Sequence, residues 1–237
     1  MANATVHTGA SPAPKSLPAR FVGIITSPRE TYESVTAHPV WFGMLALVAV
    51  TMALLVGGLL STKTGQDAWL DMMVARGVSD QQLQGMQRIA PFVGYFAAGQ
   101  FLILLPIFAL VISGILFAVF NAAMGGTSTF KQNLAVVVHA GPISILSALF
   151  TMPLNYWRGT MSSGTNLGVL LPMLPEKSFA AQFLGLIDLF LIWQLVVLSI
   201  GLAVLYRRRT QPIATALLAV YVVIALIIAF VRGGTGA

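Results

Sequence analysis

Cysteine is absent from the 237 residues, and charged residues are scarce at 8% of the chain. Without cysteine the chain can form no disulfide, no thiolate metal site and no cysteine nucleophile. Soluble domains carry about a quarter charged residues, whereas 57% of this sequence is hydrophobic. These proportions exclude an ordinary soluble domain and predict an integral membrane protein.

Catalytic and cofactor motifs are also missing. The sequence contains no HExxH, no GxSxG and no Walker loop, which are signatures of zinc proteases, serine hydrolases and nucleotide-binding proteins. The stretch GGTSTFKQ lacks P-loop spacing, and we interpret it as a turn in which Thr129 and Gln132 form a capping box. We therefore expect no cofactor, no metal and no enzymatic activity.

The net charge of +6 arises from 13 basic and 7 acidic residues. In a membrane protein such an excess governs orientation and favours contact with anionic lipid headgroups. No soluble segment interleaves a basic patch with aromatic residues, which excludes nucleic acid as a partner. The expected partners are the lipid bilayer, with its anionic headgroups, and an unidentified membrane or cytoplasmic protein.

Five apolar stretches are long enough to cross a bilayer, for which about 20 residues suffice. The second is so long that we expect it to be tilted, kinked at Pro106, or begun outside the bilayer. The sequence predicts an all-α membrane protein, a bundle of five transmembrane helices. The predicted spans are residues 40–60, 91–120, 134–152, 183–206 and 213–230.

The distribution of Lys and Arg orients this bundle. With five spans, the amino-terminal segment shares a side with the short turn that holds Arg207, Arg208 and Arg209 and no acidic residue. The longer loop at 61–90 balances its basic residues with aspartates. Because short loops rich in Lys and Arg stay in the cytoplasm, we expect the amino terminus there.

The stretch RFVGIITSPRETYESVTAHPVW precedes the first span and follows a predicted disordered tail at 1–19. Ser27 and Glu30 have capping-box spacing, so a helix should begin at Pro28 and end before Pro39. Helical periodicity predicts an amphipathic element in the cytoplasmic interface; the alternative is a connector packed on the end of the bundle. The residues predicted at the membrane interface are Arg20, Phe21, Ile24, Ile25, Arg29 and Tyr32.

The loop after the first span has helical signals of its own. GQDAWLDMMVARG is typical of a short helix that ends at Gly77, and Ser79 with Gln82 has the spacing of a second capping box. The sequence therefore predicts a short helical hairpin on the outer surface.

Three stretches carry a family resemblance: FVGIITSPRETYESVTAHPVW, RGVSDQQLQGM and GGTSTFKQNLAVVVHAGPISIL. Their order of aromatic, Pro, Glu or Thr, Gly-turn and Lys residues resembles prokaryotic members of the Yip-one domain family, the five-span membrane proteins that interact with Ypt and Rab GTPases. The Asp-Leu-Tyr-Gly-Pro element of eukaryotic members is absent. The resemblance implies a Yip-like domain over residues 20–231, a bacterial cytoplasmic membrane and a membrane-organising or trafficking-related role.

His139 and Asp188 lie within predicted spans, where ionisable groups are costly and tend to be functional. With a rise of about 1.5 Å per residue, both lie at similar depths in a core about 30 Å thick. They therefore form a possible intramembrane polar pair, although interhelical hydrogen bonds without function are a common alternative.

These observations favour a non-enzymatic membrane protein of the Yip-like class that organises the membrane or serves as a trafficking-type adaptor. The alternative is a small transporter, channel or lipid translocator that uses the intramembrane polar residues.

Overall fold

The computed structural model describes residues 13–161, 163–175 and 178–233. Within these ranges the chain is built from helices, and its β contact is an isolated bridge between Asn166 and Asp188. The predicted all-α membrane fold is confirmed. The α-helices are α1 (Leu17–Thr26), α2 (Pro28–Ala37), α3 (Phe42–Ser61), α4 (Lys63–Ala75), α5 (Asp80–Ile89), α6 (Val93–Phe117), α7 (Phe130–His139), α8 (Pro142–Arg158), α9 (Phe179–Leu186), α10 (Leu189–Leu205) and α11 (Thr210–Gly233).

Four helical segments in the described residues are long and apolar enough to cross a membrane: Phe42–Ser61, Asp80–Ala123, Phe130–Arg158 and Thr210–Arg232. The predicted fourth span is not one helix, because the chain breaks between α9 and α10. The apolar remainder, α10, has 17 residues, which is close to the lower limit of about 17 for a crossing. The predicted span at 134–152 is likewise divided, between α7 and α8, just before Pro142.

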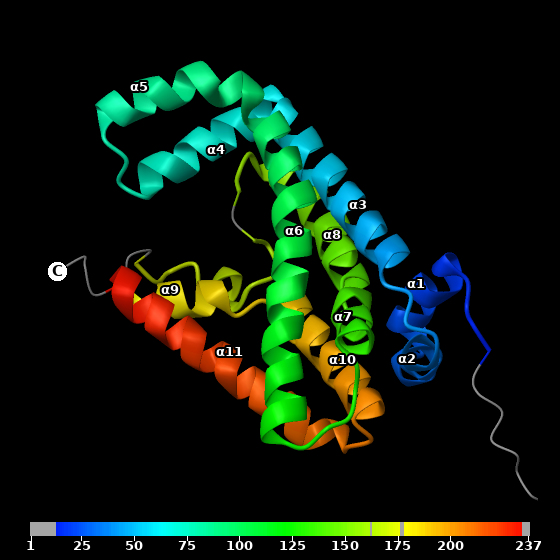
Figure 1. Ribbon diagram of the computed structural model, residues 1–237. Coiled ribbons are helices and arrows are strands. Elements are labelled where there is room, and N and C mark those ends of the chain that lie inside the picture. The colour runs from blue at the N-terminus through cyan, green and yellow to red at the C-terminus, as the bar shows by residue number, and fades with distance from the viewer. Residues whose placement is uncertain (1–12, 162, 176–177, 234–237) are drawn as a thin grey trace, which may run out of the picture.

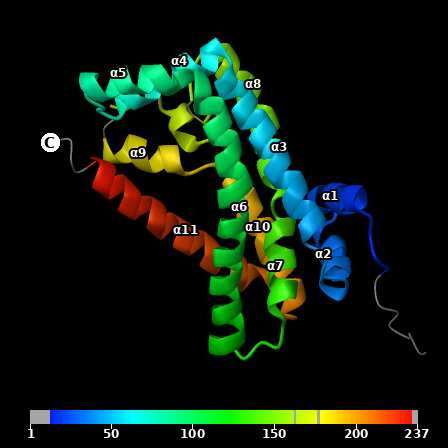
Figure 2. The same cartoon turned by 45° about the horizontal axis from the view of Figure 1, so that its top comes forward.

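The two ends of the bundle carry different elements (Figure 1). α1, α2 and the turn between α10 and α11 lie toward one end, and the hairpin of α4 and α5 projects from the other. α11 diverges from α6 and packs against α10 and α9. Figure 2 shows the same arrangement from a second direction.

Among the described helices, α3 and α6 make the most extensive contact with each other, and small residues make their close approach possible. A Cβ on Gly57 would lie 3.0 Å from both the Ala98 Cβ and the Gly94 carbonyl oxygen. A Cβ on Gly94 would lie 2.6 Å from the Gly57 carbonyl oxygen and would fall on the Ser61 hydroxyl. Such contact between backbones is the usual means by which helices associate in lipid.

One aromatic side chain of α2 packs between two helices of the bundle. Tyr32 is fully buried, and its hydroxyl donates to the Val136 carbonyl oxygen of α7 at 3.3 Å. Across the ring, a Cβ on Gly201 of α10 would lie 2.7 Å from two Tyr32 ring carbons. Glycine at 201 is therefore what allows the Tyr32 ring to enter between α7 and α10.

Most of the residues predicted at the membrane interface pack against other parts of the protein. Helical periodicity identifies an apolar face but does not say whether lipid or protein covers it. The packing matches the alternative, a connector on the end of the bundle. Arg20, Ile24 and Tyr32 are buried, Phe21 and Ile25 are half-buried against the core clusters, and Arg29 is exposed.

The boundaries of α2 agree with the prediction, but its capping does not. Ser27 makes no side-chain cap, and its N–H donates to the Gly23 carbonyl oxygen at 2.8 Å to close α1. Glu30 pairs instead with the Lys15 ammonium at 2.8 Å. The predicted tail at 1–19 is also too long, because α1 begins at Leu17; residues 1–12 lie outside the described residues.

The helical hairpin and two of the capping boxes are confirmed. Ser79 and Gln82 cap α5 reciprocally, and Thr129 and Gln132 cap α7 in the same way. Gly77, which separates α4 from α5, has a φ of 81° that favours glycine.

Replacement of Gly94 by alanine should loosen the α3–α6 pair. Because the new Cβ would meet backbone, we expect a loss of about 1–3 kcal/mol in the free energy of unfolding. Gly99→Ala is the matched control on the same helix, since a Cβ there meets nothing within 4 Å. Unfolding in mixed detergent micelles measures both, and equal stability of the two variants would contradict the packing described here.

Candidate functional site

Arg20 and His139 meet in the protein interior. The Arg20 Nη1 lies 3.1 Å from His139 Nε2 and donates to the Val40 carbonyl oxygen at 2.9 Å. An arginine has only donors, so Nε2 must accept, and the proton of the neutral imidazole is then on Nδ1. Nδ1 lies 2.7 Å from the Ala135 carbonyl oxygen and donates to it. One neutral tautomer therefore satisfies both ring nitrogens.

The Arg20 guanidinium has no carboxylate partner among the described residues. Only 9% of the residue is exposed, and burial lowers the pKa of Arg20. Its contact, His139, is the last residue of α7, where the helix dipole favours a cation. The dipole and the Val40 carbonyl oxygen thus stabilise the charge, and the interaction fixes α1 and the start of α3 to the end of α7.

Asp188 does not join this cluster, so the predicted His139–Asp188 pair does not form. Its Oδ1 accepts hydrogen bonds from the N–H groups of Phe190 and Leu191 at 2.9 and 3.2 Å. Its Oδ2 accepts from the hydroxyls of Ser163 at 2.8 Å and Thr165 at 2.5 Å. Asp188 is therefore the N-cap of α10 rather than a residue midway along a continuous helix.

Tyr221 and Thr165 also satisfy backbone groups at the break before α10. The N–H of Asp188 donates to the Tyr221 hydroxyl of α11 at 3.0 Å, and that hydroxyl donates to the Leu186 carbonyl oxygen. The N–H of Leu189 donates to the Thr165 carbonyl oxygen at 3.2 Å. The Thr165 carbonyl oxygen from the loop after α8 and the Tyr221 hydroxyl from α11 thus replace hydrogen-bond partners lost where α9 ends.

A pocket of about 260 Å³ adjoins Asp188 between α8 and α10. Ser144 and Gln194 line it, and the Ser144 hydroxyl donates to Gln194 Oε1 at 3.1 Å. Ser144 and Gln194 also line a more apolar cavity of about 310 Å³ toward α6. Polar side chains therefore lie within the bundle in two separate places, around Asp188 and Gln194 and around His139 with Arg20.

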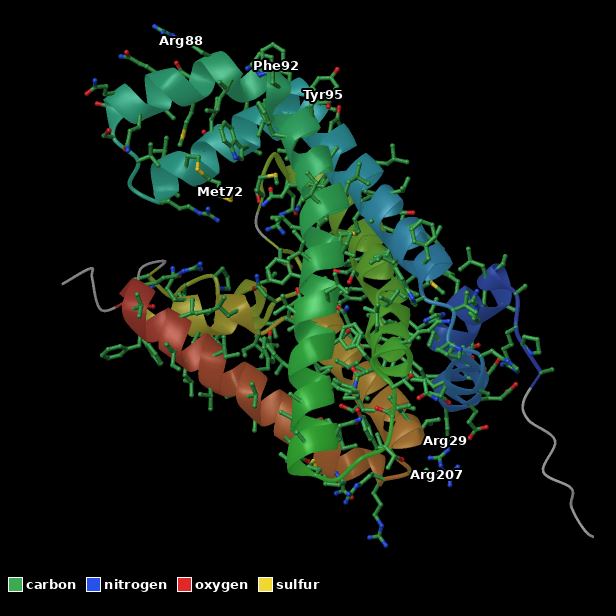
Figure 3. The ribbon with its side chains drawn as sticks, viewed as in Figure 1. Arg29, Met72, Arg88, Phe92, Tyr95 and Arg207 are labelled. Carbon is green, nitrogen blue, oxygen red and sulfur yellow. The ribbon has the colours of Figure 1, made fainter. Side chains whose placement is uncertain are left out.

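The predicted basic turn lies at the opposite end of the molecule from the hairpin. Arg207, Arg208 and Arg209 are exposed between α10 and α11, and Figure 3 places Arg207 near Arg29 and far from Arg88. Arg208 Nη2 donates to the Met124 carbonyl oxygen at 3.1 Å, which joins this turn to the end of α6.

Several polar residues of these clusters carry no signal that singles them out in the sequence. Ser163 and Thr165 belong to a loop rich in Ser, Thr and Gly, which predicts a turn and nothing more. Tyr221 is one of two aromatic residues, with Phe230, in a long apolar helix. Within the described ranges no group of three His, Asp or Glu side chains is placed to hold a metal ion.

Comparison of the sequence with known proteins finds similarity to membrane proteins. The sequence model of the Yip1 domain matches residues 22–232. The chain is 29% identical to "Membrane protein YknW" of Bacillus subtilis over 187 residues, which cover 76% of this chain and 75% of that protein. No solved structure matches the chain.

Loss of the Arg20 side chain should release α1 and α2 from the bundle. Arg20→Ala leaves the buried His139 Nε2 unsatisfied, at a cost of about 1–3 kcal/mol. Arg29→Ala is the control, because its contact with Glu33 at 3.7 Å is exposed. Ser34→Cys, a buried position, reports undocking through maleimide labelling in this cysteine-free chain. Similar labelling in the two arginine variants would refute the role of Arg20.

Proposed function

Because the chain belongs to the Yip1 domain family, we propose that it is a non-enzymatic adaptor of the bacterial cytoplasmic membrane, and that its hairpin binds a second membrane protein. The observation that carries this proposal is the state of α5. This helix is capped at Ser79 but has no buried residue. A folded amphipathic helix that contributes nothing to the core of its own protein is available to another protein.

A groove beneath the hairpin supplies the second half of the contact surface. It has a volume of about 670 Å³ and lies between α4, described residues of the segment from Gly159 to Leu174, and the first half of α9. Apolar side chains such as Met72, Val169 and Leu171 line it, together with the carboxylate of Asp71. This chemistry suits a short apolar segment with a basic residue in the partner's extracytoplasmic loop.

The hydrogen bonds of the polar groups inside the bundle support a non-enzymatic role. Arg20 and His139 bind each other, and the Asp188 carboxylate accepts four hydrogen bonds that stabilise the start of α10. Groups engaged in this way hold a structure together, whereas a catalytic site needs a nucleophile or base directed at substrate.

The orientation follows from the basic turn. We propose that Arg207, Arg208 and Arg209 face the cytoplasm, since short basic loops stay inside. The amino-terminal helices lie toward the same end of the bundle, so the hairpin of α4 and α5 faces outward.

Site-directed crosslinking tests the adaptor. Single cysteines at Met72 in the groove and at Ile103, which is 63% exposed on α6, are labelled with a benzophenone maleimide in native membranes. We expect a discrete protein adduct from position 72 and only lipid adducts from position 103. The partner identified by mass spectrometry should lose that adduct when Leu83→Asp and Met86→Asp are introduced in α5. An adduct that persists in the Leu83→Asp and Met86→Asp variant, or the absence of an adduct at position 72, would exclude this function.

A small transporter, channel or lipid translocator is the second candidate, favoured by the pocket at Asp188 and Gln194. Reconstituted liposomes test it through ion flux and the movement of a fluorescent lipid between leaflets. The adaptor predicts rates equal to those of protein-free liposomes. A protein-dependent rate that Asp188→Asn abolishes would favour the transporter, because asparagine still caps a helix but carries no charge.

A further inference from the structure

A further pocket, of about 380 Å³, lies between the α6–α7 loop and the α10–α11 turn. We call it the loop–turn pocket; its polar rim comprises Gly125, Gly126, Thr127, Ser128, Arg207 and Arg208. It is at the end of the bundle where Arg29 and Arg207 lie (Figure 3). None of the interactions proposed for the hairpin involves it.

A hydrogen-bonded network holds the loop side of this pocket. Asn121 Nδ2 donates to the Ser128 carbonyl oxygen at 2.7 Å, and the Ser128 hydroxyl lies 3.0 Å from Asn121 Oδ1 and 2.8 Å from the Tyr206 hydroxyl. Asn133 Nδ2 donates to the same Tyr206 hydroxyl at 2.8 Å. A hydroxyl has one proton, so when Ser128 donates to Asn121, Tyr206 donates to Ser128. The loop is therefore ordered before any ligand arrives.

The backbone around the pocket is shaped for close approach. Gly125 has a φ of 69°, and a Cβ on Gly126 would lie 2.7 Å from the Phe120 carbonyl oxygen and from the Tyr206 ring. Arg207 has a φ of 51°, which is uncommon for a residue with a side chain. The segment that follows α6, Ala118–Ala123, is a π-helix, a form often found at functional sites.

The pocket has positive charge and free donors. Arg207 and Arg208 line it, no carboxylate does so among the described residues, and the bond from Arg208 to the Met124 carbonyl oxygen holds one guanidinium at the rim. The N–H groups of Thr127 and Ser128 have no acceptor within the described chain. Guanidinium groups with backbone N–H groups in a glycine-containing loop are the donors that proteins use to bind phosphate.

We propose that the loop–turn pocket binds a phosphate ester, and that its source is the headgroup of an anionic phospholipid. The pocket is lined by Phe120, which follows the apolar helix α6, and by Leu205 at the end of the apolar helix α10. A headgroup bound there would have its acyl chains beside apolar helices. Basic residues near an anionic membrane surface each strengthen binding about fivefold. The bound phosphate would join the α6–α7 loop to the α10–α11 turn.

Binding of short-chain phosphatidylglycerol to the full-length protein in detergent tests the site by isothermal titration calorimetry. Arg207→Gln with Arg208→Gln should weaken binding about 25-fold, at about fivefold per arginine. Arg76→Gln with Arg88→Gln is the control, because it removes the same charge at the hairpin end. Arg207→Gly relieves the positive φ, so it keeps the fold and should weaken binding about fivefold.

The outcomes distinguish a lipid headgroup from a soluble phosphate ester as the bound ligand. Tight binding of phosphatidylglycerol, but not of short-chain phosphatidylcholine or glycerol phosphate, together with loss in the 207–208 variants alone, supports the lipid site. Glycerol phosphate bound as tightly, with the same loss, would overturn the lipid source and leave a soluble phosphate ester. Equal weakening in the 76–88 control, or no weakening in either 207 variant, would overturn the pocket altogether.

Discussion

Every backbone N–H and C=O inside a bilayer must find a partner within the protein, and this constraint explains where the polar side chains of this chain lie. Helices break before Asp188 and after His139. At the first break the Asp188 carboxylate and the Tyr221 hydroxyl replace missing backbone partners, and two hydroxyls hold that carboxylate in place. At the second, an arginine approaches the carboxyl end of α7. The costly polar groups thus coincide with the interruptions in the helices.

The same constraint relates the amino-terminal helices to the bundle. α1 and α2 bring a cation to the end of α7 and an aromatic ring to a gap that Gly201 leaves open. They cover polar and small positions that lipid would cover poorly. These two helices are therefore a structural part of the bundle, and the surfaces that we propose for other molecules are the hairpin of α4 and α5 and the basic turn at the opposite end.

The sequence predicts much of this architecture and less of the site. Long apolar runs and two capping boxes, at Ser79 and Thr129, report local physics, so the long helices and the hairpin could be predicted. The break at Asp188 could not, because an aspartate in an apolar run has the same local signal in mid-helix and at a cap. Its partners Ser163 and Thr165 come from a distant loop, and Arg20 finds His139 across 119 residues. Tertiary contacts of this kind leave no periodic pattern in the sequence.

The central claim is that the Asp188 carboxylate acts on the backbone of α10 as a cap. Amide hydrogen exchange at Phe190 and Leu191, measured by NMR in micelles, addresses it directly. An asparagine caps a helix about as well as an aspartate, whereas alanine does not. We expect Asp188→Asn to keep the slow exchange of these two amides and Asp188→Ala to lose it. Slow exchange in both variants, or its loss in both, would contradict the claim.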